Sequence, residues 1–216
     1  MKKQIAAKFD KKQIPSLPRV VFEGRVIVVI SAQEAERAVS FLLAQPILGI
    51  DTETRPSFKK GTVHKVALLQ VSTADVCFLF RLNYIGMAAP IVRLLEDTTV
   101  PKVGLSLHDD LMMLHKLGKF TAGLFIDLQD CVKKMGVEDQ SLQKLFANFF
   151  GRRISKAQQL SNWEADVLND KQKSYAATDA WSCVMLYNEW RRLEETGGYE
   201  LIKNEEHVQA SDSQKR

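Results

Sequence analysis

The sequence predicts an α/β domain built on a mixed β-sheet flanked by helices, with an all-helical C-terminal third. Three observations lead to this class. Short β-branched segments alternate with amphipathic segments of helical period over the first 135 positions. Two of the short segments are separated only by a polar turn, which indicates an antiparallel hairpin in the sheet. Beyond residue 135 the pattern is wholly helical.

The first strand, the first helix and the second strand follow from local signals. Residues 25–30 are short and β-branched, and Ser31 and Glu34 form a capping box that starts a helix ending near Ala44. Residues 47–53 are nearly all apolar until their end, as expected of a central strand covered on both faces. Two carboxylates therefore stand where this second strand emerges from the sheet.

The next two strands, 65–71 and 76–80, are joined by the polar turn 72–75 and form the predicted hairpin. The later elements are a helix at about 87–96, a strand at 100–105, a helix at about 109–117, a short segment at 124–127, a helix at about 128–135 and a long helix from about 170 to 195.

Length and composition indicate one globular domain. The chain has 216 residues, of which 45% are hydrophobic, and this excludes a disordered or collagen-like chain. Residues 1–20 and 203–216 are polar and are expected to be mobile tails, which leaves residues 21–202 as the domain. The three cysteines are widely spaced and form no zinc-binding pattern, and no apolar run approaches the roughly 18 residues needed to span a bilayer. We therefore expect a soluble, cytoplasmic protein without a membrane partner.

Asp51 and Glu53 stand two apart on the second strand, so their carboxylates point to the same face. Two such charges repel each other, and at the end of a buried strand they require a raised pKa, basic partners or bound cations. The alternative is a solvated strand end that Arg55, Lys59 and Lys60 neutralise.

Tyr175 and Asp179 are four apart on the long helix and lie one turn above each other. Small residues around them, such as Ala176 and Ala180, permit a close approach to a strand. The alternative is an ordinary amphipathic helix whose aspartate is solvated.

A third acidic pair, Asp109 and Asp110, follows the strand at 100–105 in the first turn of a helix. The helix dipole favours an acid there by about 0.3–1 kcal/mol, which explains one of the two aspartates without any function.

In this order, the three segments resemble the three exonuclease motifs of the DEDDy 3′-5′ exonucleases, most closely the branch that holds the Werner-syndrome exonuclease domain and ribonuclease D. Residues 65–71, 161–163 and 175–180 resemble the same branch. The resemblance covers about residues 45–195 and implies a ribonuclease H-like fold. It also implies a metal-dependent nuclease that removes nucleoside 5′-monophosphates from the 3′ end of DNA or RNA.

The resemblance assigns roles to five residues. Its first motif matches Asp51 and Glu53 and its third matches Tyr175 and Asp179. In the second motif the family's spacing from a glycine to the acid fits Asp110, with Asp109 as the alternative. The four acids would hold two divalent cations, and all-oxygen ligands favour Mg²⁺ or Mn²⁺. Tyr175 would orient the attacking water.

A single-stranded or frayed 3′ end is the substrate that this resemblance implies. Phe58 follows the first motif, where the family often places an apolar side chain on the terminal bases; a hydrophobic plug over the sheet end is the alternative. The cations that are candidates for phosphate contacts are Lys59, Lys60, Arg152, Arg153 and Lys156.

Two other functions remain open from the sequence. One is a catalytically silent nucleic-acid-binding module of the same fold, and the other is an interaction domain without a ligand. The sequence indicates no protein partner, and nothing in it distinguishes DNA from RNA as the substrate.

Overall fold

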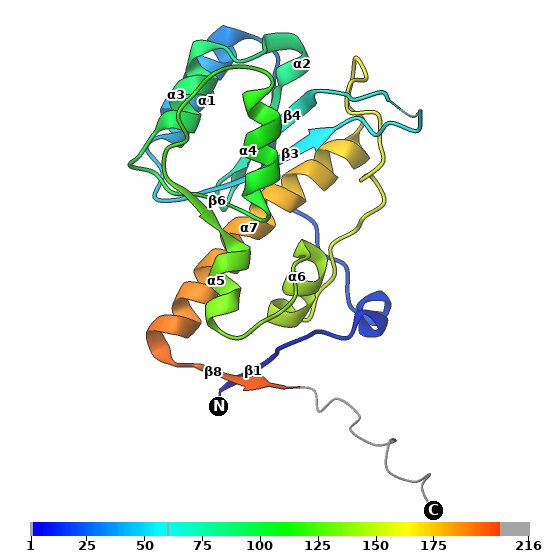
Figure 1. Ribbon diagram of the computed structural model, residues 1–216, viewed down its shortest axis with the longest axis vertical. Coiled ribbons are helices and arrows are strands. Elements are labelled where there is room, and N and C mark those ends of the chain that lie inside the picture. The colour runs from blue at the N-terminus through cyan, green and yellow to red at the C-terminus, as the bar shows by residue number, and fades with distance from the viewer. Residues whose placement is uncertain (1, 60, 204–216) are drawn as a thin grey trace, which may run out of the picture.

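A six-stranded mixed sheet forms the centre of the computed structural model, which describes residues 2–59 and 61–203 (Figure 1). The strands lie in the order β2-β5-β4-β3-β6-β7, and β4 runs antiparallel to both of its neighbours while the other pairs are parallel. The predicted class and the predicted β4–β5 hairpin are thereby confirmed. The strand bounds are β2 Arg25–Val29, β3 Leu48–Thr54, β4 Val66–Ser72, β5 Val76–Arg81, β6 Lys102–Gly104 and β7 Phe125–Asp127.

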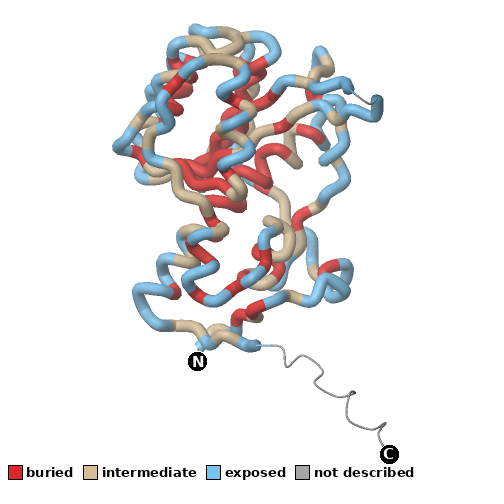
Figure 2. Tube along the Cα trace, viewed as in Figure 1, coloured by how far each residue is buried: buried red, intermediate tan, exposed pale blue. Residues whose placement is uncertain are grey.

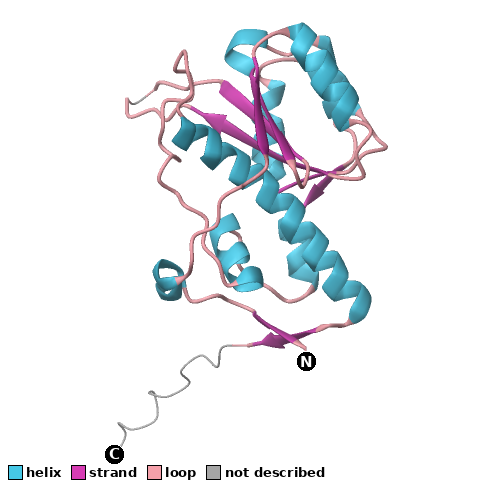
Figure 3. Cartoon of the chain, turned by 180° about the vertical axis from the view of Figure 1, so that it is seen from behind, coloured by secondary structure: helices cyan, strands magenta, loops and turns pink. Residues whose placement is uncertain are grey.

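Helices cover both faces of this sheet (Figures 1 and 3). One face packs against α1 (Ala32–Leu42), α3 (Ala89–Glu96) and α4 (Leu107–His115). The other face is crossed by the long helix α7 (Asp170–Thr196). The buried stretches concentrate in the strands and in the middle of α7 (Figure 2). A short helix, α2 (Leu82–Ile85), follows β5 directly.

A close contact between β3 and α7 sets the distance between the two elements that carry acids. A Cβ placed on Gly49 would lie 2.0 Å from the carbonyl oxygen of Ala180, so only glycine fits there. Leu48 and Ile50 point to the α1 face, which leaves Gly49 and the odd-numbered residues after it facing α7. Asp51 and Glu53 consequently lie under α7.

The second half of α7 packs against α5 (Leu128–Lys134) and α6 (Leu142–Phe150), around a separate apolar core. The C-terminal third is helical as predicted, apart from residues 151–169, which contain no regular helix, and a final strand that the sequence analysis missed. That strand is β8 (Tyr199–Ile202), and it pairs in parallel with β1 (Lys3–Ala6).

Residues 2–20 do not form the mobile tail that the sequence predicts. Ile5 of β1 is fully buried against α5, α6 and α7, and Ile14 is buried within a 3-10 helix, η1 (Lys11–Ser16). Lys3 also pairs with Glu189 of α7. The second predicted tail, 203–216, lies outside the described residues except for Lys203.

Within the described ranges, no helix is both long enough and apolar enough to cross a membrane.

Candidate active site

Three carboxylates from two elements meet at one end of the sheet. Asp51 and Glu53 come from β3 and Asp179 comes from α7, and one carboxylate oxygen of each lies within 4.8 Å of the others. Glu53 is 9% exposed and Asp179 is 7% exposed, so little water reaches either side chain. The structure thus brings together three of the four acids predicted as ligands, from positions far apart in the sequence.

Burial and mutual repulsion raise the pKa of each of these acids. The pKa of Asp51 lies well above its usual value because of burial, with Asp179 and Asp110 adding repulsion. The pKa of Glu53 rises to about 10 for the same reasons, with Asp51 as the first repelling charge. Burial raises the pKa of Asp179 to about 7, although Tyr175 and Lys156 counteract the rise. Without cations, the cluster therefore retains protons near neutral pH.

The fourth acid, Asp110, projects from the first turn of α4 toward the same end of β3. Its Oδ1 accepts a hydrogen bond from the hydroxyl of Thr52. Burial raises its pKa to about 6 against the lowering effect of that bond, and Asp109 and Asp127 add repulsion. Asp109 is exposed on the outer side of α4. Of the two alternatives in the second motif, Asp110 is the one beside the cluster.

Tyr175 lies one turn before Asp179 on α7, half-buried at the edge of the acid cluster. Burial raises the pKa of its hydroxyl, and the neighbouring Asp179 and Glu53 raise it further. The Tyr175 ring packs at 6.0 Å from the ring of Trp163, which is fully buried. The hydroxyl consequently keeps its proton and can act as a hydrogen-bond donor.

A cavity of about 260 Å³ opens onto these acids and is polar on the side of the carboxylates. Its other walls come from α6 and from residues 154–159, where Lys156 lies. These residues belong to the stretch 151–169 without regular helix, which we call the irregular segment. The positive charge of Lys156 lowers the pKa of Asp179. Of the four predicted phosphate contacts that the structure describes, Lys156 is the one that lines this cavity.

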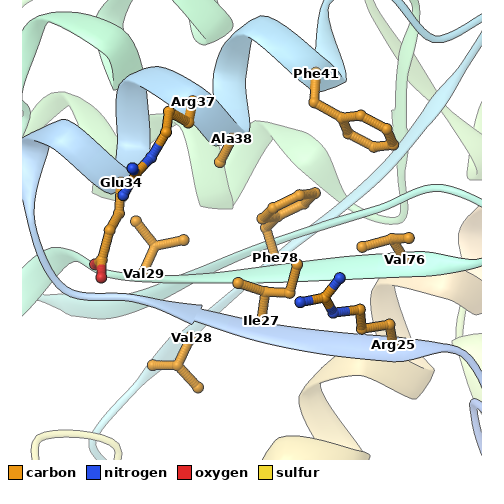
Figure 4. A pocket seen from close by; sticks show the side chains of 10 residues that line it. All are labelled: Arg25, Ile27, Val28, Val29, Glu34, Arg37, Ala38, Phe41, Val76 and Phe78. Carbon is orange, nitrogen blue, oxygen red and sulfur yellow. The ribbon is translucent and has the colours of Figure 1, made fainter.

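A larger cavity of about 420 Å³ lies elsewhere, between α1 and the outer strands β2 and β5 (Figure 4). Apolar side chains such as Ile27, Phe41 and Phe78 form most of its wall, with Arg25 and Arg37 at its rim. Among the described residues, no group of three or more potential metal ligands lies at this cavity. Of the lining residues that the structure describes, Glu34 is the one with a carboxylate, and this side chain is engaged in the capping box of α1, so the lining does not repeat the group of acids of the smaller cavity.

The loop that follows β3 exposes Phe58 almost completely, at 86% of its surface. The alternative of a plug over the sheet end is therefore wrong. Lys59 is exposed next to it, whereas Lys60 lies outside the described residues.

Arg152 and Arg153 precede the cavity wall on the irregular segment. Arg152 is exposed, but Nε of Arg153 donates a hydrogen bond of 2.9 Å to the carbonyl oxygen of Leu17. Arg153 therefore ties η1 to the segment and is partly committed to that contact.

Two features of the site were not found from the sequence. Thr52 lies between Asp51 and Glu53, but by strand alternation its side chain points to the opposite face of β3, where it donates a hydrogen bond to Asp110. The hydroxyl at this position was the one signal in the sequence that could have indicated this contact. Glu164 accepts from Nη1 of Arg55 at 3.2 Å and lies 3.1 Å from Nδ1 of His64. Through these two contacts, Glu164 joins the loop after β3 to the irregular segment. No local sequence signal indicates this connection.

The chain is similar to known 3′-5′ exonucleases. A family model described as 3′-5′ exonuclease matches residues 26–193. The chain is 27% identical over 204 residues to the bifunctional 3′-5′ exonuclease/ATP-dependent helicase WRN of Mus musculus, covering 89% of this chain and 15% of that protein. The chain spans between 15% and 65% of the length of the WRN protein and of two further curated relatives.

Solved structures share the same fold. The Nibbler EXO domain of Aedes aegypti matches with a TM-score of 0.73 at 21% identity, covering 82% of this chain and 92% of that one. The RNase D of Trypanosoma brucei in complex with RNA U12 matches with a TM-score of 0.68 at 18% identity, covering 88% of this chain and 77% of that one.

Proposed function

The chain belongs to the family of 3′-5′ exonuclease domains, and from this membership we propose that it is itself a metal-dependent 3′-5′ exonuclease. Its fold is the ribonuclease H-like fold of such domains. The observation that carries the proposal is the meeting of Asp51, Glu53 and Asp179, whose carboxylate oxygens lie within 4.8 Å of one another. Such a group of buried acids is costly to ionise unless cations neutralise it.

The donor set fits hard divalent cations. Every ligand atom in the cluster is a carboxylate oxygen, and oxygen donors without thiolate or imidazole favour Mg²⁺ or Mn²⁺. Asp51, Glu53 and Asp179 would hold one ion, and Asp51 with Asp110 would hold a second. Ions of this kind supply Lewis acidity for the attacking water and for the leaving oxygen.

The proposed reaction is hydrolysis of the last phosphodiester bond. The oxygen of water bonds to phosphorus, and the bond from phosphorus to the 3′ oxygen of the preceding nucleotide breaks. The products are a nucleoside 5′-monophosphate and a strand that is one nucleotide shorter and ends in a 3′-hydroxyl.

The side chains around the acids have separate tasks in this reaction. Tyr175 keeps its proton because its pKa is raised, so its hydroxyl orients the water and does not serve as the base. Lys156, whose charge acts on Asp179 across the cavity, contacts the phosphate. Phe58 is exposed on the loop after β3 and stacks on the terminal bases of a single-stranded or frayed 3′ end of DNA or RNA.

A degradation assay on a 5′-labelled oligonucleotide with Mg²⁺ or Mn²⁺ tests the proposal. We expect a ladder that shortens one nucleotide at a time and stops on addition of EDTA. Asp110→Asn should abolish the ladder, whereas Asp109→Asn, which alters the adjacent exposed acid on the same helix, should retain it. Binding of the oligonucleotide without shortening would instead support a catalytically silent module.

A further inference from the structure

The start of α4 has an unusual backbone. Ser106, which directly precedes the helix, has φ 60° and ψ 38°, and it is the only residue other than glycine with a positive φ among those described. Side chains with a Cβ are disfavoured in this left-handed region, so the surrounding structure must hold Ser106 there. The serine side chain does not cap α4 in the usual way.

A single carboxylate holds this backbone in place. Oδ1 of Asp127 accepts a hydrogen bond of 3.1 Å from the backbone N–H of Ser106, and Oδ2 accepts one of 2.8 Å from the backbone N–H of Leu107. Oδ1 also accepts from the backbone N–H of Gln129 at 2.9 Å. Both oxygens of Asp127 are thus used as acceptors, each for a group at the start of a helix.

A second contact reinforces the first. Nε2 of Gln129 donates a hydrogen bond of 2.6 Å to Oγ of Ser106, and Gly104 pairs with Asp127 between β6 and β7. A Cβ on Gly104 would lie 2.8 Å from the carbonyl oxygen of Ile50, so the turn also lies directly against β3. The turn is therefore fixed between two strands and α5.

We propose that Asp127 is a positioning residue: its carboxylate holds Ser106 and Leu107, fixes the first turn of α4, and thereby sets the place of Asp110 beside the acid cluster. Asp110 follows Leu107 by less than one helical turn, so a change in the direction of that turn moves its carboxylate. The consequence for catalysis rests on the proposed nuclease function. The effect on the backbone does not.

Asp127→Asn is the informative variant because it is nearly isosteric. An asparagine side chain offers only one acceptor oxygen, so its NH₂ group would face a backbone N–H in either orientation. Asp97→Asn is the matched control. Asp97 accepts from the backbone N–H groups of Thr99 at 3.0 Å and Val100 at 2.7 Å, in a turn that precedes β6.

Amide hydrogen exchange of the metal-free protein gives a readout that does not depend on activity. For Asp127→Asn we expect exchange at least about tenfold faster than in the unmodified chain at Ser106 or at Leu107, whichever backbone N–H faces the NH₂ group, because that amide loses its acceptor. Asp97→Asn should leave this segment unchanged. Unaltered exchange in Asp127→Asn, or equal acceleration in Asp97→Asn, would overturn the proposal.

A Mn²⁺ titration followed by electron paramagnetic resonance, and the nuclease assay at each Mn²⁺ concentration, test the consequence. Residues that orient metal ligands typically change metal affinity or activity by about 10–100-fold, and we expect a loss in this range for Asp127→Asn. Retention of full Mn²⁺ affinity would overturn the proposal. If the unmodified chain showed no nuclease activity while the exchange and Mn²⁺ results held, the proposed function would fail and the positioning role would stand.

A second substitution tests whether the backbone conformation is the cause. Glycine adopts the left-handed region without strain, so Ser106→Gly introduced together with Asp127→Asn should restore part of the lost Mn²⁺ affinity. Absence of any recovery would contradict the role of Asp127 in holding Ser106. If Asp127→Asn does not fold, Gln129→Ala removes the second contact and should produce a smaller effect in the same direction. No effect would again overturn the proposal.

Discussion

The hydroxyl of Thr52 donates a hydrogen bond to Oδ1 of Asp110, and this bond joins the strand that carries two acids to the helix that carries another. Thr52 lies between Asp51 and Glu53 but points to the opposite face of β3. Both faces of this short stretch therefore contribute to one site. Asp51 and Glu53 meet α7 on one side, and Thr52 meets α4 on the other.

Thr52→Val should lower activity by at least about tenfold, because a hydrogen bond to a charged group contributes about 1.5–3 kcal/mol. Valine keeps the shape of threonine and leaves Asp110 without its donor. Thr52→Ser keeps the hydroxyl and serves as the control, with activity expected within about twofold of the unmodified chain. Steady-state rates at several Mg²⁺ concentrations measure the effect. Equal rates for the valine and serine variants would contradict a role for this bond.

The metal-free protein should lose stability as the pH rises from about 4.5 to 7. In this window the folded state keeps protons on acids such as Asp179, whose folded pKa is about 7, while the unfolded chain has released them. The unfolded state then binds fewer protons, so the free energy of unfolding falls with pH. Melting curves in EDTA across this range measure the effect, and added Mg²⁺ should reverse the loss.

Asp179→Asn provides the control for that experiment, because it removes one of the titrating acids. At pH 8 in EDTA the variant should be more stable than the unmodified chain by at least about 1 kcal/mol, which corresponds to a melting temperature roughly 2–4 °C higher. It should also gain less from Mg²⁺. A variant that is less stable than the unmodified chain in EDTA would show that the acids do not repel one another as described.

The sequence was sufficient for elements whose signals are local. The capping box of Ser31 and Glu34 starts α1 as predicted, and the alternation of β3 places Asp51 and Glu53 on one face. The missed elements depend on contacts between distant segments. β1 is short and rich in lysine and glutamine, and it forms a strand only because β8 lies beside it.

The same distinction applies to the site. The acids could be predicted from their positions in the motifs, but the roles proposed for Thr52 and Asp127 depend on hydrogen bonds to residues about 20 or more positions away. From the sequence, Arg153 and Lys156 were equally good candidates for phosphate contacts. In the structure, Arg153 instead donates a hydrogen bond to Leu17, because η1 lies beside it. Charge in a loop does not reveal which cation faces the cavity.

Ile5→Ala should destabilise the protein by about 2–4 kcal/mol, because it removes a fully buried side chain from the core around α7. Gln4 is exposed on the same strand, and Gln4→Ala should change stability by no more than about 0.5 kcal/mol. Urea unfolding measures both. A mobile N-terminal segment would instead make the two variants indistinguishable.

Phe58→Ala should raise the KM for an oligonucleotide by about tenfold, since stacking of a base on an aromatic ring contributes about 1–3 kcal/mol. Because Phe58 is almost fully exposed, its removal should leave the melting temperature unchanged. Val63 is also exposed in this loop and is aliphatic, so Val63→Ala serves as the control with less than a twofold effect. Equal effects of the two variants would argue against a base contact at Phe58.

Anomalous scattering from crystals soaked in Mn²⁺ tests the central claim most directly. We predict two peaks, both within coordination distance of Asp51, with Glu53 and Asp179 on one ion and Asp110 beside the other. Both peaks should be lost in Asp51→Asn. A saturating Mn²⁺ soak that leaves these four carboxylates without a bound ion would contradict the account.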